Sequence, residues 1–383
     1  MKTLRFGIIG CGMMGREFAS AAARWFHLPR MSLRPEIVAI CRRNLSPENV
    51  NWFKNNIPTI KQITSDYREL LNNPDVEAVY ISVPHNLHQE FYCAALDAGK
   101  HLMAEKPFGI DKKANDAIMA GIGKHPESFV RCSSQFMFFP AVQRIGQMVE
   151  ADDFGRIIEV NVGFLHCSDL DPAKEINWKR MVEFNGEYGC MGDLGMHVFH
   201  IPARLGWRPR NVRALLSNIM TERPDKEGRI VPCETWDNAI LCCEAATPDG
   251  SEFPMLLSMK RIAPGEGNTW FMRVMGTEFS AGFSTKNPKE IRTLEYTPGG
   301  EQAWRSLDLP HKAPYASITG SIFEFGFSDA ILQMFAAFLD ELAHGEDMKQ
   351  PFACATPEEA LASHRLFTAA LESQRTAQVV AVE

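Results

Sequence analysis

Apolar and polar positions in the first 105 residues follow two alternating patterns. Short apolar runs of strand length are separated by longer amphipathic stretches with helical spacing, such as residues 17–25 and 88–98. The apolar runs cover residues 4–9, 36–41, 76–83 and 101–104. This order predicts an α/β region in which a parallel, doubly wound sheet carries helices on its faces.

From about residue 130 the apolar runs become longer and alternate with polar positions, which predicts an α+β region with a large, mostly antiparallel open sheet. These runs span residues 156–164, 212–218, 238–244, 252–261 and 270–276. Helical patterns at residues 328–344 and 356–374 finish the chain. Since 383 residues exceed what one core usually supports, we expect two domains, residues 1–132 and 133–383.

Composition narrows the function classes. The net charge is −7 without any Lys/Arg-rich run, which argues against a nucleic-acid partner. The chain begins without a signal-peptide pattern and contains no apolar window of the ~18 residues that a membrane span needs, so we expect no membrane association. Ten cysteines lack zinc-like spacing, which favours a reducing, cytoplasmic location.

A glycine-rich turn follows the first apolar run and opens a helical stretch. Its sequence, Gly10-Cys-Gly-Met-Met-Gly15, is the GxGxxG pattern in the context that dinucleotide binding requires. The turn residues that we predict to bind the cofactor are Gly10, Gly12, Met13, Met14 and Gly15. A glycine turn that binds nothing is the alternative.

Arg42 and Arg43 stand after the second run, where an acid usually holds the adenosine ribose. Because arginine pairs with a ribose 2′-phosphate, these residues favour NADP(H) over NAD(H) as the NAD(P)(H) cofactor. Two solvated surface charges are the alternative.

Three further segments follow the glycine turn in order: Val83-Pro-His-Asn-Leu-His88, Ala104-Glu-Lys-Pro107 and Gly189-Cys-Met-Gly-Asp-Leu-Gly-Met-His197. Together they resemble the Gfo/Idh/MocA oxidoreductases over nearly the whole chain. The resemblance implies a Rossmann domain, NAD(P)-dependent chemistry on carbohydrate-like substrates, and a second-domain sheet that often forms an oligomer interface. We therefore expect a homodimer or homotetramer.

The resemblance also implies roles for individual residues. Lys106, Asp193 and His197 match the catalytic residues. Cofactor contacts beyond the glycine turn and the two arginines are expected at Pro84, Asn86, His88, Glu105 and Lys106. Substrate contacts are expected at Lys106, Trp178, Lys179, Asp193, His197 and His200.

Helical spacing supports part of this assignment, because Asp193, His197 and His200 lie on one stripe of a helix. A neutral imidazole at His197 suits the removal of a carbinol proton, and the ammonium of Lys106 suits a developing alkoxide. Purely structural roles remain open: a surface position for Lys106, a helix cap for Asn86 or Asp193, interface packing for His200 and core packing for Trp178.

Other functions are also compatible with these residues. We predict no metal site, although His85, His88, Asp193, His197 and His200 could supply ligands. A relative that retains NAD and cycles the hydride during lyase or glycoside hydrolase chemistry is a second alternative. A non-catalytic dinucleotide sensor is a third. Our main prediction is an NAD(P)-dependent dehydrogenase for a secondary alcohol or ketone of a sugar, polyol, inositol or glycoside.

Overall fold

The computed structural model describes residues 1–309, 313–320, 325–348 and 353–383. The chain forms two compact units, and neither is continuous in sequence. The first unit comprises Met1–Gly109, Lys113–Phe138 and Lys312–Pro357, and the second comprises Ile110–Lys112, Phe139–His311 and Glu358–Glu383. They differ from the continuous domains 1–132 and 133–383, chiefly because a late helix joins the first unit.

The first unit contains a six-stranded sheet in the order β3-β2-β1-β4-β5-β6, and every pair is parallel. Its strands are β1 (Lys2–Ile9), β2 (Leu33–Cys41), β3 (Gln62–Thr64), β4 (Ala78–Ile81), β5 (His101–Ala104) and β6 (Val130–Cys132). Its helices are α1 (Met13–Ala23), α2 (Pro47–Asn56), α3 (Tyr67–Leu71), α4 (His88–Asp97), α5 (Lys112–Lys124) and α9 (Phe327–His344). The predicted doubly wound parallel sheet is confirmed.

The core of the first unit explains why α9 belongs to it. The ring of Phe18, on α1, lies 5.0 Å from that of Phe6 on β1 and 4.5 Å from that of Phe335 on α9, measured between centroids. All three rings are buried. A helix encoded near the end of the chain therefore completes the apolar layer over the first helix.

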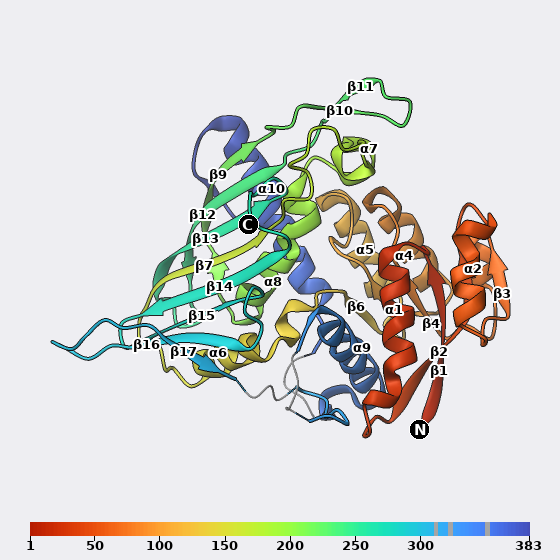
Figure 1. Cartoon of the computed structure of the whole chain (residues 1–383), viewed down its shortest axis with the longest axis horizontal. Helices are drawn as coiled ribbons and strands as arrows, with labels where there is room; N and C mark the ends of the chain where they lie inside the picture. The colour runs from red at the N-terminus through yellow and green to blue at the C-terminus, as the bar shows by residue number, and fades with distance from the viewer. Residues whose placement is uncertain (310–312, 321–324, 349–352) are drawn as a thin grey trace. The chain divides into compact units, whose positions relative to one another are not determined.

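The second unit contains a ten-stranded sheet, in the order β17-β16-β15-β14-β7-β13-β12-β9-β18 with β8 beside β12 (Figure 1). Its strands are β7 (Ile157–Leu165), β8 (Arg208–Pro209), β9 (Asn211–Ser217), β12 (Asn238–Ala246), β13 (Glu252–Lys260), β14 (Thr269–Gly276), β15 (Phe279–Ser284), β16 (Glu290–Glu295), β17 (Arg305–Asp308) and β18 (Val380–Ala381). β10 (Glu222–Pro224) and β11 (Ile230–Pro232) form a separate pair. Within the large sheet β7 and β13 are parallel and the other recorded pairs are antiparallel, which confirms the predicted mostly antiparallel sheet.

Alternation along the strands gives this sheet two different faces. On β13, alternate side chains from Phe253 to Met259 are buried, while Pro254 and its equivalents on the other face are not. The helices of this unit are α6 (Pro140–Glu150), α7 (Val182–Asn185), α8 (Met196–Arg204) and α10 (Pro357–Thr376). Because α8 packs on β7 and β13, the helical layer covers the apolar face, and side chains such as Leu215 remain 56% exposed.

Each strand and terminal helix predicted from the sequence lies within a few residues of one in the structure, whereas other strands, such as β3, β6 and β15, were not predicted. Within the described residues, no helix is both long enough and apolar enough to cross a membrane.

Candidate active site

The glycine turn between β1 and α1 is shaped by two close backbone approaches. Gly10 has φ +99°, and a Cβ there would lie 2.1 Å from the carbonyl oxygen of Ser82. A Cβ on Gly15 would lie 2.4 Å from the carbonyl oxygen of Gly10. The fold of the protein alone therefore requires glycine at these two positions.

Gly12 is different, because a Cβ there would meet nothing within 4 Å. Gly12 is also the N-cap of α1 and provides no side-chain cap to the first helical N–H groups. A helix N-terminus with its N–H groups uncapped and an open approach suits the pyrophosphate of a dinucleotide. The open space beside Gly12 leaves room for a ligand, and Met13, which is 75% exposed, follows Gly12 in the chain.

Arg42 and Arg43 follow β2 directly and differ in exposure and contacts. The Arg42 Nη1 donates a hydrogen bond to the carbonyl oxygen of Cys11 at 2.9 Å, which ties the end of β2 to the glycine turn. Arg43 is exposed. The guanidinium of Arg42 thus lies beside the glycine turn, at the position where Rossmann sheets bind the substituent on the adenosine ribose.

Asn86 lies in the turn after β4, two residues beyond Pro84. Its Oδ1 is buried and has no hydrogen-bond partner among the described residues. The N-cap of α4 is Leu87, without a side-chain cap, so Asn86 does not have the helix-capping role considered from the sequence. A buried amide oxygen without a partner fits a contact with a bound cofactor.

His88 has a structural position instead of the predicted cofactor contact. The ring is wholly buried and stacks on Tyr92 at 4.8 Å between centroids. Its Nε2 lies 3.1 Å from the carbonyl oxygen of Val83, and its Nδ1 accepts the N–H of Gly109 at 3.5 Å. His88 therefore joins the loop after β4 to the loop after β5, because both ring nitrogens face backbone groups.

The Glu105-Lys106-Pro107 segment follows β5 at the carboxyl end of the parallel sheet, where such folds bind ligands. Glu105 is buried; it accepts the Tyr80 hydroxyl at 2.5 Å, and its carbonyl oxygen accepts the Tyr92 hydroxyl at 2.7 Å. Burial raises the pKa of Glu105, and the nearby Lys106 ammonium opposes this shift. Glu105 thus anchors the segment from inside the unit, its predicted cofactor contact stays a prediction, and Lys106 is only partly buried.

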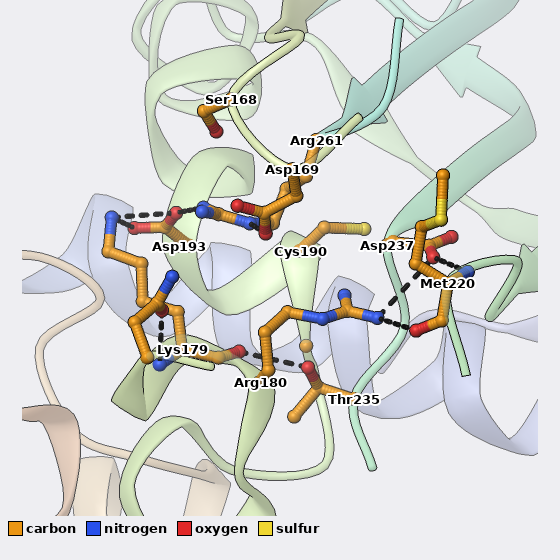
Figure 2. A network of polar contacts seen from close by, with 12 residues as sticks. Ser168, Asp169, Lys179, Arg180, Cys190, Asp193, Met220, Thr235, Asp237 and Arg261 are labelled. Atoms are coloured by element: carbon orange, nitrogen blue, oxygen red, sulfur yellow. Dashed lines mark hydrogen bonds and ion pairs between the residues drawn. The ribbon is translucent and has the colours of Figure 1, made fainter. Parts of the chain in front are cut away.

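In the second unit the Asp193 carboxylate is held between two cations (Figure 2). The Lys179 Nζ lies 2.8 Å from its Oδ1 and 3.0 Å from its Oδ2. The Arg261 Nη1 donates to Oδ2 from the other side. Because Asp193 is buried, these charge-assisted bonds fix the orientation of its carboxylate. Lys179 and Asp193, which were both predicted to bind substrate, therefore form an ion pair with each other.

The stripe predicted for Asp193, His197 and His200 is changed by a π-helical turn. Met191–Gly195 is π-helical and α8 begins at Met196, so Asp193 precedes the regular helix and its angular position departs from the 100° per residue assumed. His197 is buried, with its ring edge-on to Phe164 at 5.6 Å. Its carbonyl oxygen accepts the Trp270 Nε1 at 2.9 Å, so the backbone that presents the imidazole is fixed.

His200 packs inside the unit and does not present a surface to a ligand. It is wholly buried, and its Nε2 lies 3.7 Å from Oε2 of Glu359, which Arg204 also binds. Burial lowers the pKa of His200 to about 4, with Glu359 opposing the shift. The substrate contact predicted for His200 is therefore replaced by the structural role that the sequence left open. Trp178, by contrast, is only partly buried, and the Lys179 Nζ lies 5.7 Å from its ring centroid.

Part of the chain matches a known protein family. Residues 4–121 match the Gfo/Idh/MocA family, described as an oxidoreductase family with an NAD-binding Rossmann fold. The matched residues make up much of the first unit, so this part of the chain is similar to the Gfo/Idh/MocA oxidoreductases. The resemblance read from the sequence is thereby confirmed.

Two curated proteins are similar to part of this chain. A levoglucosan dehydrogenase from Pseudarthrobacter phenanthrenivorans is 29% identical over 60% of this chain and 57% of that protein. A trans-1,2-dihydrobenzene-1,2-diol dehydrogenase from Sus scrofa is 27% identical over 55% of this chain and 59% of that protein. The matches thus span less than two-thirds of either relative.

Solved structures of two dehydrogenase-type proteins share the fold. A levoglucosan dehydrogenase in complex with NADH matches with a TM-score of 0.87 at 22% identity, covering 100% of both chains. An inositol dehydrogenase homologue complexed with NAD+ from Azotobacter vinelandii matches with a TM-score of 0.78 at 17% identity, covering 99% of this chain and 97% of that chain. At these identities the likeness establishes the fold.

Two residues of the buried charge network around Asp193 were absent from the sequence prediction: Arg261, and Asp169, whose Oδ2 accepts the Arg261 Nε at 2.8 Å. Arg261 follows directly after β13, and Asp169 lies in the loop after β7. For Arg261 the sequence signal is a charged residue at the end of an alternating apolar strand. The buried charges around Asp193 therefore include residues that only the tertiary structure brings together.

Proposed function

We propose that this protein is an NAD(P)-dependent dehydrogenase that acts on a secondary alcohol or ketone of a sugar, polyol, inositol or glycoside. The observation that carries the proposal is the buried Asp193 carboxylate, bound by Lys179 and Arg261 four residues before His197. The names of the relatives, dehydrogenases of levoglucosan and of a dihydrodiol, agree with a vicinal-hydroxyl substrate.

Bound nicotinamide would accept or return the hydride. The residues of this chain would then handle the proton and the charge on oxygen. His197 would accept the hydroxyl proton, since imidazole exchanges protons near neutral pH, and Lys106 would stabilise the alkoxide. Asp193 would hold the Lys179 ammonium in position to bind a neighbouring substrate hydroxyl, while Trp178 would pack on the apolar face of the sugar.

For the cofactor we propose a preference for NADP(H). Gly10, Gly12 and Gly15 would receive the pyrophosphate, and Asn86 would contact the nicotinamide side. The support for the 2′-phosphate is the position of Arg42 beside the glycine turn together with the exposed Arg43.

For assembly we propose a homodimer or homotetramer that buries the open face of the large sheet, in the cytoplasm. Apolar side chains on that face, including Leu215 at 56% exposure, support this arrangement. Exposed apolar side chains favour association of this face with a second copy, and association increases with protein concentration.

Turnover tests the function directly. Purified protein is incubated with NAD+ or NADP+ and a panel of sugars, polyols, inositols and glycosides, and nicotinamide absorbance is followed. We expect substrate-dependent reduction of the cofactor. Conversion of a glycoside without net change in a tightly retained cofactor would favour the hydride-cycling lyase or hydrolase. Dinucleotide binding without any turnover would favour the sensor.

A further inference from the structure

Arg261 occupies a fixed position at the end of β13. Its backbone N–H donates to the carbonyl oxygen of Asp237 at 2.8 Å, and its own carbonyl oxygen accepts the N–H of Asp169 at 3.1 Å. The side chain is buried. The backbone that carries the guanidinium is therefore fixed by hydrogen bonds at both its N–H and its carbonyl oxygen.

The guanidinium joins two buried carboxylates (Figure 2). Its Nε donates to Oδ2 of Asp169 at 2.8 Å, and its Nη1 donates to Oδ2 of Asp193. The Lys174 Nζ lies 3.1 Å from Oδ1 of Asp169, and Lys179 binds Asp193. Cations and anions therefore alternate along this cluster, in the order Lys174, Asp169, Arg261, Asp193 and Lys179. Buried charges are stable only when paired, and a planar fork fixes direction as well as distance. Arg261 thus determines where the Asp193 carboxylate lies.

The end of the cluster away from Asp193 is anchored. Arg223, wholly buried, donates Nη1 bonds to the carbonyl oxygens of Asp171 at 2.6 Å and Lys174 at 3.2 Å, and an Nη2 bond to that of Asp169. The loop that carries Asp169 is therefore clamped by backbone contacts. Burial would raise the pKa of Asp169, but Arg261 and Lys174 outweigh this and lower the pKa to about 2, so Asp169 remains a permanent anion.

Lys179 alone would hold Asp193 less firmly. Its side chain is 32% exposed and reaches the carboxylate through a flexible stem, whereas the Arg261 side chain is almost fully enclosed. We propose that Arg261 is the positioning residue that sets the orientation of Asp193 for turnover, with Asp169 as the fixed counter-charge. This inference rests on the proposed dehydrogenase function.

A buried arginine can also serve the fold alone, and Arg180 offers a matched control. It is equally buried and binds Asn218 Oδ1 at 2.8 Å and the Met220 carbonyl oxygen at 2.9 Å, with Asp237 at 3.4 Å. Its hydrogen bonds recorded in the described part of the chain do not include Asp193. Arg180→Lys should therefore change thermal stability and leave the turnover of the folded enzyme unchanged.

The test compares Arg261→Met, Arg261→Lys, Asp193→Asn and the double variant Asp193→Asn/Arg261→Met with the wild type and Arg180→Lys. Circular dichroism establishes the folded fraction of each. We expect Arg261→Met to lower kcat about 10²-fold, the effect of a misplaced catalytic group, while NADPH affinity stays constant. Arg261→Lys should rescue part of the loss, because it keeps the charge without the fork. The double variant should be no slower than Asp193→Asn, since Arg261 acts through Asp193.

Two outcomes would overturn the inference while the proposed function stands. One is a folded Arg261→Met enzyme with wild-type kcat beside an inactive Asp193→Asn. The other is a double variant whose loss is the product of the two single losses. Absence of turnover in the wild type would instead overturn the proposed function. Crystal structures of the wild type and Arg261→Met provide a third, independent test, in which a rotated Asp193 carboxylate supports the inference and an unmoved one refutes it.

Discussion

Replacing Gly12 with alanine separates the needs of the fold from those of the cofactor. Gly12 has φ −80° and ψ −158°, a conformation that alanine adopts, and its added Cβ would meet nothing within 4 Å. The expected cost in folding free energy is that of a poorer N-cap, up to about 1 kcal/mol. Gly12→Ala should therefore purify as a folded protein.

Dinucleotide binding should suffer far more. The new methyl group would stand where the pyrophosphate approaches the first N–H groups of α1. Losing one hydrogen bond to a charged group costs about 1.5–3 kcal/mol. At about 1.4 kcal/mol per factor of ten, the Kd for NADPH should rise roughly 10- to 100-fold.

Fluorescence titration with NADH and NADPH measures the effect, and thermal unfolding by circular dichroism measures stability. Gly123 on α5 provides the matched control, because its added Cβ would also meet nothing within 4 Å. Gly123→Ala should keep wild-type affinity and gain up to about 1 kcal/mol from helix propensity. A Gly12→Ala protein that binds both dinucleotides as the wild type does would show that the pyrophosphate does not lie on this turn.

Four further predictions concern the chemical step, the cofactor preference, the stability in acid and the assembly. His197→Ala and Lys106→Ala should each lower kcat on the order of 10²- to 10⁴-fold at nearly constant dinucleotide affinity, with a less than additive double variant; unchanged kcat in steady-state assays would remove the residue from the chemical step. Arg42→Asp should reverse the preference from NADPH to NADH in paired Kd measurements, and equal wild-type affinities would refute the 2′-phosphate role. The folded pKa of Asp169, about 2, lies below its usual 3.8, so about 2 kcal/mol of stability present at neutral pH should be lost as pH falls from about 4 toward 2; Asp169→Asn should flatten this dependence in acid unfolding curves. Light scattering should give a dimer or tetramer, and a monomer at every concentration would contradict burial of the open sheet face.

The fold could be predicted because its signals are local. The glycine turn, the strand lengths and the change in periodicity near residue 130 all lie within short windows of sequence. The membership of α9 in the first unit could not be predicted, since it depends on the packing of Phe335 against Phe18. An amphipathic pattern shows that a helix has a buried face without showing what covers it.

The candidate site was predicted by position and not by orientation. Residues at strand ends were found, but the His88 ring binds backbone and the Glu105 carboxylate binds the Tyr80 hydroxyl. No sequence pattern distinguishes a side chain that faces a ligand from one that faces the interior. Arg261 and Asp193 are separated by 68 positions in the chain, and Arg261 and Asp169 by 92. No local window contains such a pair.

The route of the chain through α9 has a consequence for biosynthesis. The six strands of the first unit have been synthesised by residue 132, yet the helix that covers Phe18 emerges from the ribosome only after almost the whole second unit. Until then the nascent first unit exposes part of its aromatic layer, although N-terminal domains commonly fold first during translation. A fragment ending at residue 138 would carry the same unprotected surface, so we expect it to be unstable as a separate N-terminal piece.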